Sequence, residues 1–106
     1  MLLGILEREA GDREAAEREF REAERINPNN GQALLELGKL LLTRGELEQS
    51  RTRLEKAGEY MPASFAVHYQ LGLLYRRLGD VQKAEHHLRL SRELEAEQAR
   101  SSRQPK

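Results

Sequence analysis

Three histidines are the side chains of this sequence best suited to metal binding or proton transfer, and their spacing argues against both roles. His68 stands alone, while His86 and His87 are adjacent in the chain. Adjacent residues on a helix project about 100° apart, so these two imidazoles are not expected to converge on one ligand. The chain has no cysteine, so a metal site would also need carboxylates. We therefore expect no metal site.

Nucleophiles and phosphate-binding loops are not indicated either. Ser50 and Ser91 occupy positions that small residues share in a repeating pattern, so neither is expected to act as a nucleophile. The glycines are too widely spaced for a phosphate-binding loop, and no strand is predicted to precede one. We therefore expect a protein that is not an enzyme and has no cofactor.

The segments that carry these residues recur with a period of 34 residues. Two columns of glycine have this spacing: Gly4, Gly38 and Gly72, then Gly11, Gly45 and Gly79. Columns of apolar or small residues share it: Leu3, Leu37 and Leu71, then Phe20, Leu54 and Leu88, then Ala23, Ala57 and Ser91. A fixed period of this size indicates stacked supersecondary units rather than one globular core.

The first glycine column predicts a close helix crossing in every unit. Glycine inside a helix costs about 1 kcal/mol relative to alanine, so three at one register need a packing reason. We expect two helices of each unit to approach so closely there that a Cβ atom would clash. Small residues twelve positions later are the expected contacts on the partner helix: Ala16, Ser50 and Ala84.

The second glycine column is predicted to end the first helix of each unit, because glycine adopts the left-handed cap conformation without strain. Asp12 and Asp80 follow as N-cap candidates for the second helix, and Glu46 is a poorer cap at the same position. Pro28 and Pro62 cannot continue a helix and close two of the units.

Apolar residues recur at spacings of three and four, which predicts helices rather than strands. Leu34, Leu37 and Leu41 show this spacing in the middle unit. Charged residues on the opposite faces, such as Glu14 and Arg18, are expected to be solvated. The prediction is six helices in three antiparallel pairs, near residues 1–10, 12–26, 31–44, 46–59, 64–78 and 80–99.

These columns resemble the tetratricopeptide repeat, a pattern of 34 residues written W-x2-L-G-x2-Y…A-x3-F…P. The third unit carries its residues as Leu71, Gly72, Tyr75, Ala84 and Leu88. The second carries Leu34, Leu37, Gly38, Ser50, Leu54, Ala57 and Pro62, and the first Leu3, Gly4, Ala16, Phe20, Ala23 and Pro28. Three positions depart from the pattern: Glu7 replaces an aromatic residue, His68 replaces the tryptophan, and Ala96 replaces the last proline. The resemblance implies that His68 is a packing residue.

The resemblance implies an all-α fold, an α-solenoid of about three stacked helix–turn–helix repeats in a right-handed superhelix. We expect one domain over residues 1–98. It comprises an N-terminally clipped repeat over 1–30, a second repeat over 31–64 and a third over 65–98. Residues 99–106 are expected to form a disordered polar tail, although the missing last proline would let the final helix continue to about Arg100.

The resemblance also implies a binding groove on the concave face, lined by the first helices of the repeats. The matching positions are Ile5, Arg8, Leu35, Lys39, Leu42, Tyr69, Leu73, Arg76 and Arg77. An apolar floor with cationic residues would suit a short peptide with hydrophobic anchors and a carboxylate. The alternative is that the apolar members only help adjacent first helices to pack.

A ligand mode known for this family is not expected. Co-chaperone members hold the C-terminal carboxylate of heat-shock chaperones with lysine, asparagine and arginine. The matching positions here are Met1, Ile5, Glu36, Ala66 and Gln70. None is the required residue, and Glu36 would repel the carboxylate.

The composition excludes further classes of binding partner. The formal net charge is zero, so neither nucleic acid nor an anionic membrane is expected to bind. Residues 1–6 are apolar but lack a basic segment, which argues against a signal peptide and favours a cytoplasmic location. Arginine outnumbers lysine 14 to 4, which favours a bacterial source.

Two function classes follow, and a third stays open. The first is a scaffold for protein–protein interaction that binds a peptide or protein in the groove. The second is an assembly element, either the C-terminal piece of a longer array or a homodimer joined through an N-terminal helix bearing Leu2 and Leu6. The third is that the repeats serve an enzyme domain outside this chain.

Overall fold

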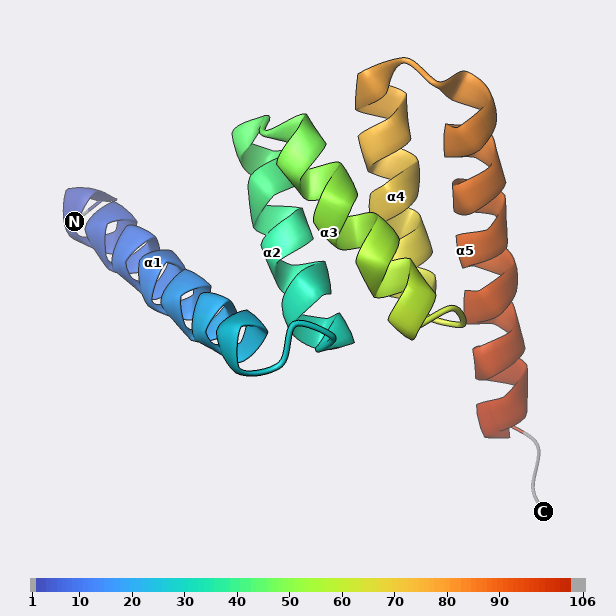
Figure 1. Cartoon of the computed structure of the whole chain (residues 1–106), viewed down its shortest axis with the longest axis horizontal. Coiled ribbons are helices and arrows are strands. Elements are labelled where there is room, and N and C mark those ends of the chain that lie inside the picture. Colours follow the sequence, from blue (N-terminus) through green and yellow to red (C-terminus); the bar gives the residue numbers. More distant parts are fainter. Residues whose placement is uncertain (1, 104–106) are drawn as a thin grey trace.

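The computed structural model describes the backbone of residues 2–103 and the side chains of residues 11–103. It contains five α-helices: α1 (Leu2–Ile26), α2 (Gly31–Arg44), α3 (Leu47–Tyr60), α4 (Phe65–Leu78) and α5 (Val81–Arg103). No strand occurs within the described backbone. The helices α2 and α3 form one antiparallel pair, α4 and α5 form the next, and α1 leans against the first pair at one end of the row (Figure 1). The predicted all-α repeat solenoid is confirmed.

The turns inside the two pairs have the predicted chemistry. Gly45 and Gly79 adopt left-handed φ angles of 81° and 84°, and their N–H groups donate to carbonyls of the preceding helix turn. The Asp80 carboxylate accepts a 3.1 Å hydrogen bond from the Lys83 N–H and so caps α5. Glu46 makes no side-chain cap to α3, as expected from its residue type.

The turns between units are capped by side chains that follow each proline. The Asn30 side chain accepts a 3.0 Å hydrogen bond from the Ala33 N–H at the start of α2. The Ser64 hydroxyl accepts one of 3.3 Å from the Val67 N–H at the start of α4. Side chains of this type satisfy N–H groups that the first helical turn leaves without partners. The starts of α2 and α4, which position the first helices, are therefore held locally.

The two helices of each pair meet at glycine. A Cβ atom added to Gly38 would lie 2.5 Å from the Leu54 side chain, and one added to Gly72 would lie 2.5 Å from Leu88. The Ser50 hydroxyl, itself buried, donates a 2.8 Å hydrogen bond to the Gly38 carbonyl. The predicted close crossing is confirmed for both pairs. A leucine fills the space that each glycine leaves, and at the first crossing Ser50 also contacts the glycine.

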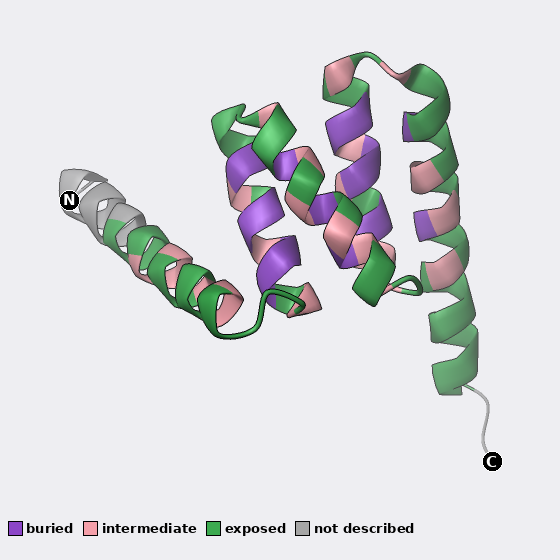
Figure 2. Cartoon of the chain, in the orientation of Figure 1, coloured by how far each residue is buried: buried purple, intermediate pink, exposed green. Residues whose placement is uncertain are grey.

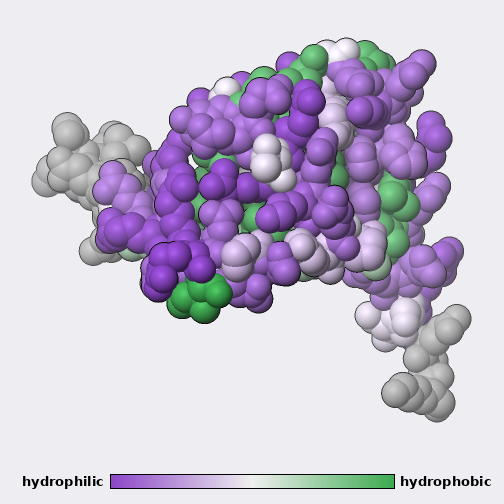
Figure 3. Space-filling view, in the orientation of Figure 1, coloured by the Kyte–Doolittle hydropathy of each residue, from purple (hydrophilic) through white to green (hydrophobic). Residues whose placement is uncertain are grey.

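The hydrophobic core is a thin layer between the helices that make these contacts. Figure 2 shows buried residues concentrated on the facing sides of α2, α3 and α4, whereas the described part of α1 and the end of α5 are mostly exposed. Leu34, Leu54, Val67 and Leu74 are among the buried residues. The face shown in Figure 3 is largely hydrophilic, with apolar side chains visible only in small groups.

The first helix differs from the prediction. Two helices, near 1–10 and 12–26, were expected, but α1 is continuous, so Gly11 is not a left-handed cap and Asp12 is not an N-cap. A turn at Gly11 would interrupt the helical hydrogen bonds, and among the described residues no atom outside the neighbouring helix backbone lies within 4 Å of the position of an added Cβ. The residues around it are strong helix formers such as Glu, Arg and Ala. Without a packed partner, the helix continues.

The last helix is also longer than expected. Helix α5 extends to Arg103, so residues 99–103 are helical rather than part of a disordered tail. The Gln98 amide donates a 3.1 Å hydrogen bond to the Ala63 carbonyl, which ties this extension to the turn before α4. No proline interrupts the helix at Ala96. Residues 104–106 of the expected tail lie outside the described part.

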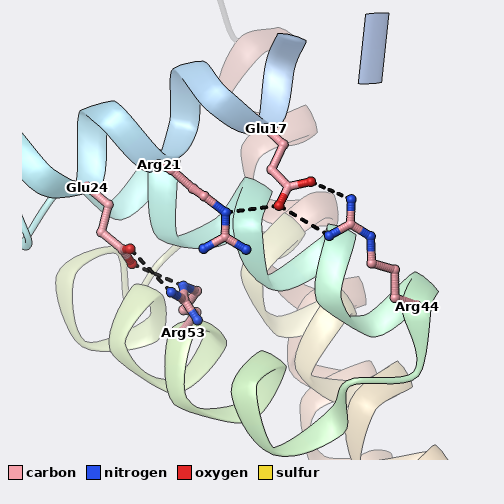
Figure 4. Close-up of polar contacts among 5 residues, drawn as sticks. All are labelled: Glu17, Arg21, Glu24, Arg44 and Arg53. Atoms are coloured by element: carbon pink, nitrogen blue, oxygen red, sulfur yellow. Dashed lines mark hydrogen bonds and ion pairs between the residues drawn. The ribbon is translucent and has the colours of Figure 1, made fainter. Parts of the chain in front are cut away.

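Ion pairs attach α1 to the rest of the array (Figure 4). Glu17 accepts hydrogen bonds from Arg21, at 2.9 Å, and from both terminal nitrogens of Arg44 on α2. Glu24 accepts from Arg53 on α3, at 3.0 Å. The Arg44 guanidinium and, next, that of Arg21 lower the pKa of Glu17 to about 2.

The glycine contacts generate a first prediction. Gly72→Leu should lower the free energy of unfolding by more than about 2 kcal/mol, because overpacking separates α4 from α5. The matched control is Gly58→Ala, where an added Cβ meets only ordinary contacts at 3.7 Å. That change should stabilise the chain by up to about 1 kcal/mol through helix propensity. Thermal melts measure the stability of both variants. An unchanged melting temperature for Gly72→Leu would show that the crossing of α4 and α5 accommodates a large side chain.

The Glu17 ion pairs generate a second prediction. The pKa of Glu17 in the folded chain lies below its usual value of 4.5, so the contribution to stability is complete above that pH. It should be lost as the pH falls from about 4.5 toward 2, because the carboxyl group is then protonated. Amide hydrogen exchange along α1 measures the loss. In Glu17→Gln the same amides should exchange faster at neutral pH and respond less to acid in this window.

Candidate functional site

The predicted concave surface contains two adjoining cavities, which together we call the groove. The first, of about 440 Å³, lies between α2 and α4 and is lined by Lys39, Leu42, Thr43, Gln70, Leu73, Arg76 and Arg77. The second, of about 260 Å³, lies at the start of α4 against α5 and is lined by Lys39, Phe65, Ala66, Tyr69, Gln70, Ser91 and Glu95. Lys39 and Gln70 line both, so the cavities form one path along α4.

The groove brings together most of the predicted site residues. Lys39, Leu42, Leu73, Arg76 and Arg77 line the first cavity, and Tyr69 lines the second. These side chains come from α2 and α4 at offsets three, four or seven residues apart, which places them on one face of each helix.

Leu35 and Leu42 lie deeper than a freely accessible groove floor would require. Leu35 is 4% exposed and Leu42 is 6% exposed, and both belong to the core. Leu35 lines neither cavity, so it contributes packing, as the alternative interpretation of these apolar positions expects. The predicted positions Ile5 and Arg8 fall in the part of α1 whose side chains lie outside the described residues.

The two ends of the groove carry opposite charges, with arginine side chains at one end and the Glu95 carboxylate at the other. Lys39 forms a 3.5 Å ion pair with Glu36, which leaves its charge partly neutralised. Arg77 donates a 2.7 Å hydrogen bond to the Leu42 carbonyl and thereby satisfies one of the last carbonyls of α2. The Arg76 side chain is exposed and forms no hydrogen bond or ion pair with residues 11–103. Glu95 lies at the other end.

The side chains that line the groove offer hydrogen-bond donors and apolar surface. The guanidinium of Arg76 offers a planar donor pair suited to a carboxylate. Tyr69, which is 48% exposed, and Leu73 offer apolar surface between the charged ends. Among residues 11–103, no group of three or more histidine, aspartate or glutamate side chains is arranged to hold a metal ion. The sequence-based expectation of a binding surface thus acquires a specific geometry.

A histidine contact on another face was not predicted. His68 on α4 is 8% exposed, and its Nε2 lies 2.8 Å from the Pro62 carbonyl oxygen. Its Nδ1 lies 3.1 Å from Nδ1 of His87 on α5. Because a carbonyl only accepts, neutral His68 donates through Nε2, and its Nδ1 accepts from His87. The implied packing role of His68 agrees with this burial.

The surroundings of His87 explain its lowered pKa. Burial lowers the pKa of His87 below its usual 6.5, and the neighbouring His68, His86 and Lys83 act in the same direction, against Glu55. His87 also stacks on Tyr75, whose hydroxyl donates to Glu55. Burial, followed by this carboxylate, raises the pKa of Tyr75 to about 12. The sequence could have indicated the contact between His68 and His87, because these positions belong to the two facing helices of one repeat.

The histidine contact generates a third prediction. A folded-state pKa below 6.5 means that the unfolded chain binds more protons, so stability should fall as the pH drops below about 6.5. His87→Gln should flatten this dependence in thermal melts between neutral pH and pH 5. The matched control is His86→Gln on the exposed side of the same helix, which should retain it. If both changes flattened the pH dependence equally, His87 would not be the group that causes it.

The repeats of this chain match those of known proteins. Two sequence profiles, both described as tetratricopeptide repeat, match residues 7–59 and 65–98, and the first covers half of the chain. The chain is also similar to bacteriophage adsorption protein A of Escherichia coli (strain K12), with 36% identity over 76 residues. That match covers 72% of this chain and 8% of the relative, which is bacterial, as the arginine content favours for this chain.

None of the described helices has a stretch that is both long enough and apolar enough to cross a bilayer. The cytoplasmic location expected from the sequence stays a prediction.

Proposed function

This chain belongs to the tetratricopeptide repeat family, whose repeats mediate protein–protein interaction, and we propose that it binds a peptide segment in the groove without catalysing a reaction. The observation that supports this best is Arg76. It is an exposed cation beside the apolar side chain of Leu73, and it has no partner among residues 11–103. An arginine in such a position is available to a ligand carboxylate.

The lining residues define the ligand's chemistry. A glutamate, aspartate or terminal carboxylate would bind at Arg76. The guanidinium of Arg77 also lines this cavity, but it already donates a hydrogen bond to the Leu42 carbonyl of α2. An apolar side chain would follow on Leu73, and another would contact Tyr69. The opposite end of the ligand would tolerate a basic group, because Glu95 lines that part of the groove. We therefore infer an acidic and apolar peptide.

Peptide binding generates a fourth prediction. A fluorescently labelled peptide that alternates leucine with glutamate should bind more tightly than the same peptide with lysine replacing glutamate. Arg76→Glu should weaken binding of the acidic peptide by about 10- to 100-fold, the value of one charge-assisted hydrogen-bonded contact. Tyr69→Ala combined with Arg76→Glu should abolish it. Fluorescence anisotropy measures the affinities, and circular dichroism should show unchanged helix content.

A matched variant separates the groove from overall charge. Arg92→Glu makes the same charge change at an exposed position of α5 that lines neither cavity of the groove. Its affinity for the acidic peptide should stay within about twofold of the unmodified chain, since distant exposed charges are screened by salt. Equal losses in Arg92→Glu and Arg76→Glu, or binding that survives the Tyr69 and Arg76 double change, would place the ligand outside the groove.

A further inference from the structure

Another cavity, which we call the furrow, lies on the side of α4 away from the groove. Its volume is about 240 Å³. Its lining residues are Glu55, Gly58 and Glu59 of α3, His68, Leu71 and Tyr75 of α4, and His87 of α5. Leu71 of the furrow and Leu73 of the groove are two positions apart, which is about 200° around a helix. The furrow therefore belongs to a different face of α4 from the groove.

The furrow exists because α3 and α5 are held apart. Both helices pack against α4, which lies between them in the row (Figure 1). Within the described backbone, no Cα atom of α3 lies within 8 Å of one in α5. The buried side chains of Leu71 and Tyr75 on α4 consequently form an apolar and aromatic floor between the two helices.

Gly58 keeps the α3 wall of the furrow open. Glycine inside a helix costs about 1 kcal/mol relative to alanine, and at Gly38 and Gly72 a close leucine explains its use. At Gly58, an added Cβ would meet Leu71 and Val67 only at 3.7 Å, which is an ordinary contact. Helix packing thus does not require glycine here. A longer side chain at this position would extend into the furrow, because Gly58 lines it.

The same wall carries two carboxylates, and no described lysine or arginine lines the furrow. Glu55 and Glu59 are four residues apart, so they share one helix face, where like charges repel. Within residues 11–103, Glu59 forms no hydrogen bond or ion pair, and Glu55 accepts only from the Tyr75 hydroxyl. The Nζ atom of Lys83 lies 5.2 Å from the centre of the Tyr75 ring but outside the lining. A cation bound between the two glutamates would relieve their repulsion.

His87 adds a hydrogen-bond acceptor from α5. In its neutral form it donates through Nδ1 to His68, so its Nε2 carries a lone pair and can only accept. Nothing within residues 11–103 donates a hydrogen bond to this nitrogen. Burial holds the pKa of His87 below 6.5, so at neutral pH the ring does not repel a cation. Acceptors therefore line the furrow from both α3 and α5.

We propose that the furrow binds an arginine side chain of a protein partner. The guanidinium would donate to the Glu55 and Glu59 carboxylates and pack on the Tyr75 ring. The apolar stem of the arginine would contact Leu71. The small volume suits one side chain, since sites for whole small molecules typically measure about 300–1,000 Å³. Because the furrow and the groove lie on different faces of α4, one chain can bind a basic segment and an acidic segment together.

Two small probes of matched shape test the arginine assignment. The isotope-labelled chain is titrated with N-acetylarginine amide and, separately, with N-acetylcitrulline amide, which replaces the charged guanidinium by a neutral urea. NMR spectra should show saturable shifts of the amide resonances of residues 55–59, 71–75 and 87 with the arginine probe. The citrulline probe should bind at least about 10-fold more weakly, the value of one charge-assisted hydrogen bond. Equal affinities, or arginine-induced shifts confined to other residues, would overturn the proposal.

Two pairs of glutamates separate the furrow from general acidity. Glu55→Gln/Glu59→Gln should weaken binding of the arginine probe by about 10-fold or more. The matched control is Glu93→Gln/Glu97→Gln, which removes two exposed glutamates that are also four residues apart but lie on α5 outside the furrow. The control should keep the affinity within about twofold, because salt screens distant exposed charges. Equal losses from both double changes would show attraction by net charge alone and contradict the proposal.

Filling the furrow provides a second measurement. Gly58→Leu keeps both glutamates but places a large side chain in the furrow, so the arginine probe should no longer bind. Circular dichroism should show unchanged helix content, since the added Cβ itself meets no close contact. Binding of the arginine probe that survives Gly58→Leu would locate it outside the furrow and overturn the proposal. Gly58 does not line the groove, so none of these outcomes depends on whether the acidic peptide binds there.

Discussion

The close approach of helices at Gly38 and Gly72 is the contact on which the rest of the architecture depends. Because no Cβ is present, Leu54 and Leu88 reach the backbone of the opposite helix, and the buried Ser50 hydroxyl satisfies the carbonyl exposed there. This contact sets the distance between the two helices of each pair. It also decides which face of α2 and α4 points inward, and hence which face is left to form the groove.

Stability is unevenly distributed along the row. The pairs α2–α3 and α4–α5 share a continuous apolar core, whereas the described side chains of α1 lie outside it and include Glu17 and Glu24, which pair with Arg44 and Arg53. Ion pairs of this kind contribute little individually and are weakened by salt. In a repeat array each unit contacts only its neighbours, so the weak attachment of α1 does not loosen the core. The two ends of the molecule therefore respond differently to pH and ionic strength.

Some residues of the groove in which we propose peptide binding also stabilise the fold. Arg77 lines it and also satisfies a carbonyl at the end of α2, while Leu42 lines it and is nearly buried. Such residues are held by the packing of the repeats, which keeps the surface ordered before a ligand arrives. Arg76 and Tyr69 have no such function among the described contacts, so they are the positions where ligand specificity can vary without loss of the fold.

Although the binding role of the groove residues stays a prediction, the sequence by itself determined the period, the left-handed caps at Gly45 and Gly79 and the glycine crossings. Each of these depends on local backbone preference or on a register that repeats. Only the tertiary structure decided the continuity of α1 through Gly11, the contact of His68 with His87 and the burial of Leu35. A glycine permits a turn but does not require one, and whether a helix turns back depends on what packs against it. Likewise, burial and side-chain contacts between helices depend on interhelical distance, which spacing along one chain does not specify.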